Sequence, residues 1–240
     1  MTLTGKTALV TGGSRGIGRA IVRRLAQDGA RVVFSFKDNK QAADDLIGEL
    51  GDAVVAVRAD QEDLASIDAL FEPVAEGLDI LVNNAAINLP ALIADVTAEE
   101  FDRVMTVNAK FPLLAMRRAA SVLRDDGRII NISTLNTVLP PPGHSLYSAS
   151  KAALEQFTAV AAREFGERGI TVNTVSPGAT DTDLLHATNS AENLEQLTAF
   201  TALRRLGRPS DIADVVAFLA GPDSGWITGQ NLRATGGLIF

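Results

Sequence analysis

The 240-residue sequence contains no cysteine and only two histidines, His144 and His186. A chain without thiols forms no disulfide bond and has no thiol nucleophile. Two imidazoles without any thiolate are too few for a structural zinc site, so we expect no such site and assign no metal ligand. Cysteine-free chains fit a reducing compartment, and we expect a cytoplasmic location.

The sequence also lacks a long apolar segment and an excess of basic residues. No apolar run reaches the ~20 residues needed to cross a bilayer, and the first residues do not resemble a signal peptide. The net charge of −7 implies an acidic surface that repels nucleic-acid phosphates. We therefore expect neither a membrane nor a nucleic acid as a partner.

Short β-prone runs alternate with longer segments of helical periodicity. The expected strands are 7–10, 31–36, 53–57, 79–82, 128–132, 170–175 and 230–234. The expected helices are 16–27, 40–50, 62–75, 98–107, 109–123, 147–168 and 209–221. This order predicts a doubly wound α/β fold, with a parallel seven-stranded sheet and helices on both faces. We expect one domain, residues 1–240.

Two stretches have no clear periodicity. Residues 135–146 contain three consecutive prolines followed by Gly143, and we expect a loop there. Residues 181–201 are polar and follow a predicted strand end, where substrate loops lie in such sheets. We expect this second segment to form a lid over the substrate.

The first predicted strand runs into a glycine-rich segment, Thr11 to Gly18, at the start of the first predicted helix. Glycines permit a tight turn and a close approach of the backbone to a ligand. A helix N-terminus offers unpaired N–H groups to phosphate. A plain strand-to-helix turn is the alternative, but the position in the first βα unit favours a dinucleotide site. The expected contacts are Gly12, Ser14, Arg15, Gly16, Ile17 and Gly18.

The end of the second predicted strand bears on the choice of cofactor. NAD-binding folds carry an acidic residue there for the ribose hydroxyls, and no carboxylate lies near Phe36. Lys37 and Arg15 instead supply positive charge for a 2′-phosphate, and Ser14 and Ser35 add hydroxyls. We predict NADP(H). Ordinary surface charges are the alternative interpretation, and an NAD-dependent dehydrogenase working in the oxidative direction is the corresponding alternative function.

Tyr147 and Lys151 are spaced i and i+4, which places them on one face of a helix. A free phenol has a pKa near ~10, and a neighbouring ammonium lowers it. Such a phenol can donate a proton to the alkoxide that hydride transfer produces. A buried aromatic beside a solvated lysine is the alternative. Tyr147 is the only tyrosine beside ten phenylalanines, which favours a chemical role for its hydroxyl.

With these motifs, Asn83-Asn84-Ala85, Asn108 and Ser176-Pro177-Gly178, the chain resembles the short-chain dehydrogenase/reductase family over essentially its whole length. It is most similar to the single-domain branch that includes 3-oxoacyl-carrier-protein reductases. The resemblance implies a Rossmann fold and an NADPH-dependent reduction of a small-molecule ketone to a secondary alcohol. It also implies a homo-oligomer, a tetramer or a dimer.

The resemblance implies roles for individual residues. Tyr147 is the acid/base, and Lys151 binds the nicotinamide ribose. Asn108 holds a water that links Lys151 to solvent, although a hydrogen-bonded helix kink is an alternative. The remaining implied cofactor contacts are Asp60 and Gln61 at the adenine, Asn83 and Ala85 along the cofactor, and Pro177, Gly178, Thr180 and Thr182 at the carboxamide and diphosphate.

The chain departs from the family at the substrate-orienting serine, thirteen residues before the tyrosine, where Thr134 stands. Threonine retains the hydroxyl that bonds the substrate oxygen. We predict Thr134 for this role, because strand alternation turns Ser133 to the other face.

The expected substrate pocket is mostly apolar, which suits a hydrophobic ketone or an acyl thioester. Its members are Thr134, Leu135, Asn136, Leu139, Pro140, His144, Ala179 and residues of the lid.

Two further alternative functions are open besides the NAD-dependent dehydrogenase. A 3-oxoacyl-carrier-protein reductase keeps Arg168 for docking, but Asp125 and Asp126 occupy a turn that is basic in such enzymes. A dinucleotide-binding sensor without catalysis uses the same fold, although it has no need of the Asn108, Thr134, Tyr147 and Lys151 set.

Overall fold

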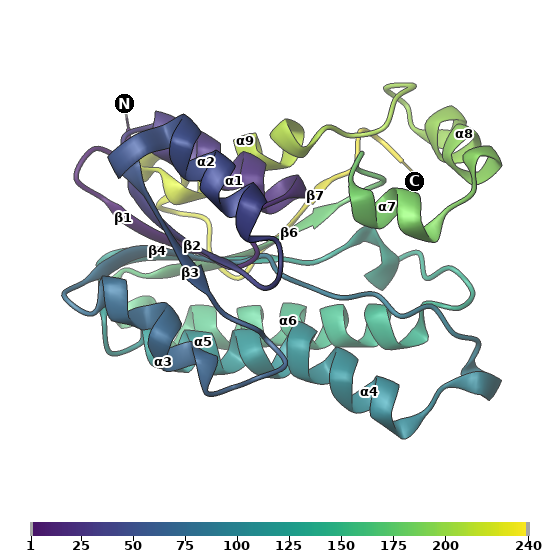
Figure 1. The fold of residues 1–240 in the computed structure, drawn as a ribbon, viewed down its shortest axis with the longest axis horizontal. Coiled ribbons are helices and arrows are strands. Elements are labelled where there is room, and N and C mark those ends of the chain that lie inside the picture. The colour runs from purple at the N-terminus through teal and green to yellow at the C-terminus, as the bar shows by residue number, and fades with distance from the viewer. Residues whose placement is uncertain (1, 239–240) are drawn as a thin grey trace.

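The computed structural model describes residues 2–238 and shows a central sheet between two layers of helices (Figure 1). Seven parallel strands lie in the order β3-β2-β1-β4-β5-β6-β7. Their bounds are Thr7–Val10, Arg31–Phe36, Val54–Arg58, Leu78–Asn83, Leu123–Ile132, Thr171–Pro177 and Asn231–Ala234, for β1 to β7. The predicted fold class is confirmed.

Helices α1, α2 and α9 cover one face of the sheet, and α3, α4, α5 and α6 lie on the other (Figure 1). The nine α-helices of residues 2–238 are Gly16–Gln27, Lys40–Leu50, Ser66–Phe71, Ala98–Met105, Phe111–Ala119, Ser145–Glu164, Asp183–Thr188, Ala191–Phe200 and Pro209–Ala220, for α1 to α9. Alternate residues of β2 enter the two cores, with Val32 and Phe34 on the α1 side and Val33 on the α5 side. Both faces of the sheet are buried, so the strands read as continuous apolar runs.

The region predicted as two helices, 98–107 and 109–123, is one helical stretch. A π-helical segment, Thr106–Lys110, joins α4 to α5. The strand β5 begins at Leu123 rather than Arg128, because a bulge lies between the pairs Leu78–Leu123 and Ile80–Arg128. Asp125 and Asp126 interrupt the apolar pattern at the start of β5, so the sequence predicted a strand only from Arg128.

The predicted lid contains two short helices, α7 and α8, although its sequence shows no clear periodicity. Each begins at a hydroxyl cap: Thr182 accepts from the Leu185 N–H and Ser190 from the Asn193 N–H. In Figure 1 both helices lie at the right-hand end of the molecule. No helix within residues 2–238 combines the length and apolarity needed to span a bilayer.

The strand order reverses at β1, which pairs with β2 on one side and with β4 on the other. In doubly wound sheets, ligands bind beyond the carboxyl ends of the strands at this switch point. The residues that follow β1 and β4 are Thr11 to Gly18 and Asn84 to Ile87, so the fold brings two of the predicted motifs to one crevice.

Candidate active site

The loop after β1 has a backbone that strongly favours glycine. Gly12 and Gly16 have φ angles of +67° and +53°, in the left-handed region. A Cβ on Gly18 would lie 2.1 Å from the Gly12 carbonyl oxygen. The helix α1 starts at Gly16 without a side-chain cap and without an acidic residue in its first turn. Its first N–H groups are therefore available to an anion.

Side chains from two neighbouring strand ends hold this loop in place. The Asn84 amide Nδ2 donates to the carbonyl oxygens of Thr11 and Gly12, at 2.9 and 3.2 Å. The Ser35 hydroxyl accepts from the Gly12 N–H at 2.9 Å. Ser35, predicted as a cofactor contact, thus holds the loop after β1 in place. Sequence reasoning missed Asn84 in this role.

Asn83, predicted to line the cofactor, lies elsewhere. It is the last residue of β4, and its Nδ2 donates to Asn131 Oδ1 at 2.8 Å inside the sheet. Strand alternation turns it away from the crevice, and the next residues, Asn84 and Ala85, line the cavity instead. The Asn-Asn pair was the available signal, but only the register shows which member faces the crevice.

A first cavity of about 250 Å³ lies over this loop. The predicted cofactor residues that line it are Gly12, Ser14, Arg15, Gly16, Ile17, Gly18, Ser35, Lys37, Asp60, Gln61, Ala85 and Thr182. Gln61 is buried, and neither polar atom of its side-chain amide has a hydrogen-bond partner within residues 2–238. Buried amides are normally paired, so Gln61 fits a donor and acceptor on a ligand base.

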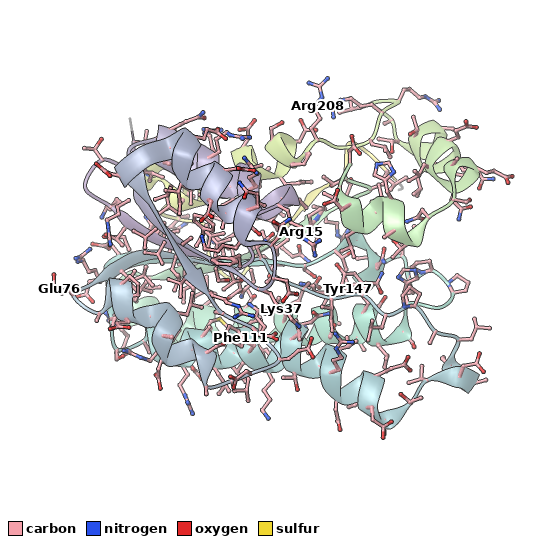
Figure 2. The ribbon with its side chains drawn as sticks, viewed as in Figure 1. Arg15, Lys37, Glu76, Phe111, Tyr147 and Arg208 are labelled. Carbon is pink, nitrogen blue, oxygen red and sulfur yellow. The ribbon has the colours of Figure 1, made fainter. Side chains whose placement is uncertain are left out.

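A second, larger cavity of about 570 Å³ adjoins the first and shares Ile17, Thr182 and Leu184 with it. The predicted residues that line it are Thr134, Leu135, Asn136, His144, Tyr147, Lys151, Pro177, Gly178, Ala179 and Thr180. The structure thus joins the phosphate loop to the Tyr147 and Lys151 pair. Arg15, Lys37 and Tyr147 are labelled in Figure 2.

The wall of the second cavity corrects part of the predicted pocket. Pro141 and Pro142 line it, not Leu139 and Pro140. Leu139 and all three prolines are exposed, Leu139 to 43%, and the course of the loop before α6 brings only the later two prolines to the rim of the cavity. Lid residues complete the wall, as predicted, but Asn88 and Pro90 carried no signal in the sequence. The added members are Asn88, Pro90, Leu184, Leu185, Thr188, Asn189, Asn193 and Leu197.

Tyr147 lies in the first turn of α6, and Lys151 follows one turn later, 2% exposed. The Lys151 Nζ donates to the Ile132 carbonyl oxygen at 2.7 Å and lies 6.0 Å from the centre of the Tyr147 ring. Burial lowers the pKa of Lys151 to about 8, against the opposing charge of Glu155. Lys151 remains cationic at neutral pH.

Burial raises the pKa of Tyr147 to about 12, and the Thr134 hydroxyl opposes this shift by hydrogen bonding. This upward shift is opposite to the predicted lowering of the tyrosine pKa by Lys151, because loss of solvent is the largest cause of the shift. Tyr147 therefore keeps its proton at neutral pH, which is the state that a proton donor requires.

The hydroxyls of Ser133 and Thr134 have different partners. Ser133 donates to Glu155 Oε1 at 2.6 Å. The Thr134 Oγ1 accepts from the Asn136 N–H at 3.2 Å, which leaves its own proton to donate. Both residues border the second cavity, but only Thr134 has a hydroxyl proton that is not committed to a carboxylate.

Asn108 is buried within the π-helical segment and lines neither cavity. Its Oδ1 accepts from the Ile87 N–H, and its Nδ2 donates to the Ile87 carbonyl oxygen and to the Ser150 hydroxyl, at 2.9, 2.8 and 3.1 Å. These bonds tie the segment after β4 to α6. They match the helix-kink interpretation, and the water-holding role stays a prediction.

The end of the first cavity beside Lys37 is charged. The Lys37 Nζ pairs with Glu62 Oε1 at 2.7 Å and with Asp60 Oδ2 at 3.0 Å. Arg15 lines the same cavity and is exposed, and its side chain has no ion-pair partner within residues 2–238. Of the two cations predicted to bind the 2′-phosphate, Arg15 has no ion-pair partner among the described residues and Lys37 is paired with carboxylates.

A doubly wound sheet whose switch-point crevice joins an anion-binding glycine loop to a Tyr–Lys pair defines a dinucleotide-dependent oxidoreductase class. A protein-family model described as "Enoyl-(Acyl carrier protein) reductase" matches residues 12–239. The short chain dehydrogenase/reductase AacuN of Aspergillus aculeatus is 40% identical, over 98% of this chain and 96% of that protein. The chain belongs to the short-chain dehydrogenase/reductase family.

Solved structures are similar over the whole chain. The angucycline C-6 ketoreductase LanV with bound NADP is 42% identical, with a TM-score of 0.93 over 99% of this chain and 96% of that one. LanV with NADP and rabelomycin has a TM-score of 0.89, at 42% identity over 99% and 97% of the two chains. LugOII, a promiscuous reductase that catalyses keto-reduction at C1 in lugdunomycin biosynthesis, is 42% identical, with a TM-score of 0.93 and full coverage of both chains.

Proposed function

We propose that this protein reduces an uncharged, largely apolar ketone to a secondary alcohol with NADPH. The main supporting observation is the position of Tyr147 in a cavity that adjoins the glycine loop, with Lys151 one turn along the same helix. NADPH supplies the hydride when bound. The chain's own residues bind and orient both molecules and deliver the proton.

The residues of the cleft fit NADP(H). The glycine loop and the start of α1 bind the diphosphate, and the unpaired amide of Gln61 binds the adenine together with Asp60. Arg15 and Lys37 bind the 2′-phosphate, and Thr182, Gly178 and Pro177 border the nicotinamide. The NADP found in LanV supports the same cofactor here.

At the reacting carbonyl, Thr134 donates a hydrogen bond to the substrate oxygen. Tyr147 then transfers its proton to that oxygen as negative charge develops on it. The Lys151 ammonium stabilises the tyrosinate that remains, which is where its charge matters most.

The lining of the second cavity indicates the substrate class. Among its lining residues only Lys151 is charged, and burial lowers the pKa of His144, which keeps that ring neutral. A carboxylate or phosphate on the substrate would find no exposed counter-ion there. Apolar walls with the amides of Asn136, Asn189 and Asn193 suit a cyclic ketone that carries hydroxyl or carbonyl groups. The rabelomycin found in LanV supports a polycyclic ketone.

A carrier-bound substrate is less favoured because Arg168 is occupied. Its Nε donates to Asp125 Oδ1 at 2.9 Å, and its Nη1 donates to the Ala120 carbonyl oxygen at 2.9 Å. The guanidinium therefore holds the turn between α5 and β5 and is not free to dock an acidic carrier. We keep the homo-oligomer and the cytoplasmic location as proposals.

Oxidation of NADPH in the presence of matched ketones tests the proposal. One set contains neutral polycyclic ketones, and the other contains the same skeletons with a carboxylate. We expect turnover of the neutral set, a strong loss with the acids, and little turnover with NADH. Tight NADPH binding without turnover of any ketone would instead support the non-catalytic sensor, and a clear preference for NADH would refute the cofactor assignment.

A further inference from the structure

Four charged residues form one connected set of ion pairs at the adenosine end of the first cavity. Lys37 follows β2, Asp60 and Glu62 follow β3, and Arg103 comes from α4. Glu62 Oε1 accepts from both cations, at 2.7 Å from the Lys37 Nζ and 2.9 Å from an Arg103 guanidinium nitrogen. Both cations lower the pKa of Glu62 to about 2, so it is a carboxylate at any working pH.

This set is electrically neutral, with two cations and two carboxylates. Lys37, Asp60 and Glu62 all line the cavity. A 2′-phosphate carries about two negative charges at neutral pH, by analogy with other phosphate monoesters. It must approach Lys37 against the charges of Glu62 and Asp60, or displace one of them from the ammonium.

Of the two carboxylates, Glu62 is the one that imitates a phosphate. A single oxygen of Glu62 bridges two cations from different elements, which is the arrangement in which a phosphate oxygen is recognised. Asp60 has a second role, because its Oδ1 accepts from the Glu62 N–H at 2.9 Å and so shapes the turn after β3.

We propose that Glu62 is a specificity-determining residue that competes with the 2′-phosphate of NADP(H) for Lys37. Its carboxylate weakens the binding of NADP(H) and leaves NAD(H) nearly unaffected. This inference rests on the proposed function, since it requires a dinucleotide in the cleft. It assigns to Arg103 the task of holding Glu62 in place. Discrimination between NADP(H) and NAD(H) then depends on two opposing effects. Arg15 attracts the 2′-phosphate, and Glu62 competes with that phosphate for Lys37.

The variant Glu62→Gln tests this, because it removes the charge with little change in shape. Glu49→Gln is the matched control: Glu49 also pairs with two arginines, Arg19 and Arg23, and lies outside the cleft lining. Both variants change the net charge by the same amount. The probes are NADPH, NADH, adenosine 2′,5′-bisphosphate and 5′-AMP, and the readout is the dissociation constant measured by titration calorimetry.

We expect Glu62→Gln to tighten NADPH and the bisphosphate by roughly five- to twentyfold, the size expected for one partly screened charge. NADH and 5′-AMP should change by less than about twofold, as should all four probes with Glu49→Gln. In a Lys37→Ala background the gain should be smaller, because the part that comes from competition for Lys37 is lost and only the direct repulsion by Glu62 remains.

Three results would overturn the inference while leaving the proposed function intact. They are an equal effect on phosphorylated and unphosphorylated probes, no change at all, and weaker NADPH binding in Glu62→Gln. If the unmodified protein bound neither dinucleotide, the proposed function would fail together with the inference.

Discussion

The Lys151 ammonium donates a 2.7 Å hydrogen bond to the carbonyl oxygen of Ile132, the last residue of β5. Thr134 lies two residues beyond this strand end, and Tyr147 lies one turn before Lys151 on α6. The carboxyl end of β5 therefore positions the cation directly and leads into the substrate-orienting hydroxyl. Both are placed by the core of the protein, not by a mobile loop.

Replacing Tyr147 with phenylalanine removes the proton donor and keeps the ring. We expect the rate of ketone reduction to fall by roughly 10²- to 10⁴-fold, the usual contribution of general acid catalysis. The dissociation constant of NADPH should stay nearly unchanged, because the glycine loop and α1 carry the phosphate contacts. Steady-state kinetics and cofactor titration measure the two quantities. Lost NADPH binding with normal chemistry would show that the role is misassigned.

The pH dependence of kcat/KM should follow Lys151. Burial lowers the pKa of its ammonium to about 8, so the cation is present below that pH and is lost as the pH rises through it. The pKa of Tyr147 is about 12, so the phenol stays protonated over this range and does not limit the rate. We expect kcat/KM for reduction to decline above about pH 8.

Lys151→Arg provides the control for this profile, because a guanidinium stays charged throughout. Whatever activity remains in this variant should lack the decline. An unmodified enzyme whose kcat/KM is flat well above pH 8 would contradict the assignment, as would an unchanged decline in the arginine variant.

The Thr134 hydroxyl can be separated from its methyl group with two variants. Thr134→Ser keeps the donor, and we expect activity within a few-fold of the unmodified enzyme. Thr134→Val keeps the shape and loses the donor, so kcat/KM should drop by about tenfold or more, the value of one hydrogen bond to a developing charge. Equal kinetics in the serine and valine variants would indicate that Ser133 or another group orients the substrate.

Gly18→Ala should damage the glycine loop. The added Cβ would lie 2.1 Å from the Gly12 carbonyl oxygen, so the backbone must move. We expect the free energy of unfolding to fall by about 1–3 kcal/mol, as for other overpacked sites, and NADPH binding to weaken.

Gly48→Ala is the matched control for that change. Gly48 lies within α2, and a Cβ added there would meet no atom of another described segment within 4 Å. Alanine should therefore stabilise the helix by about 0.5–1 kcal/mol. Chemical denaturation measures both variants. A Gly18→Ala protein as stable as the unmodified one would mean that the loop is not tightly packed.

Local features of the sequence determined the order of strands and helices, the glycine loop and the pairing of Tyr147 with Lys151 on one helix. Each depends on neighbours within a few residues: apolar periodicity, the steric freedom of glycine, and the i to i+4 spacing of a helix. These features can therefore be predicted without the three-dimensional arrangement.

The tertiary structure alone decided which residues meet across the sheet. Strand register selected Asn84 over Asn83 to hold the phosphate loop. Chain segments distant in sequence brought Glu62 to Lys37. Burial set the upward direction of the Tyr147 pKa shift. Solvent exclusion and charge pairing depend on how segments remote in sequence pack together. The sequence pattern does not give the distance in space between such segments.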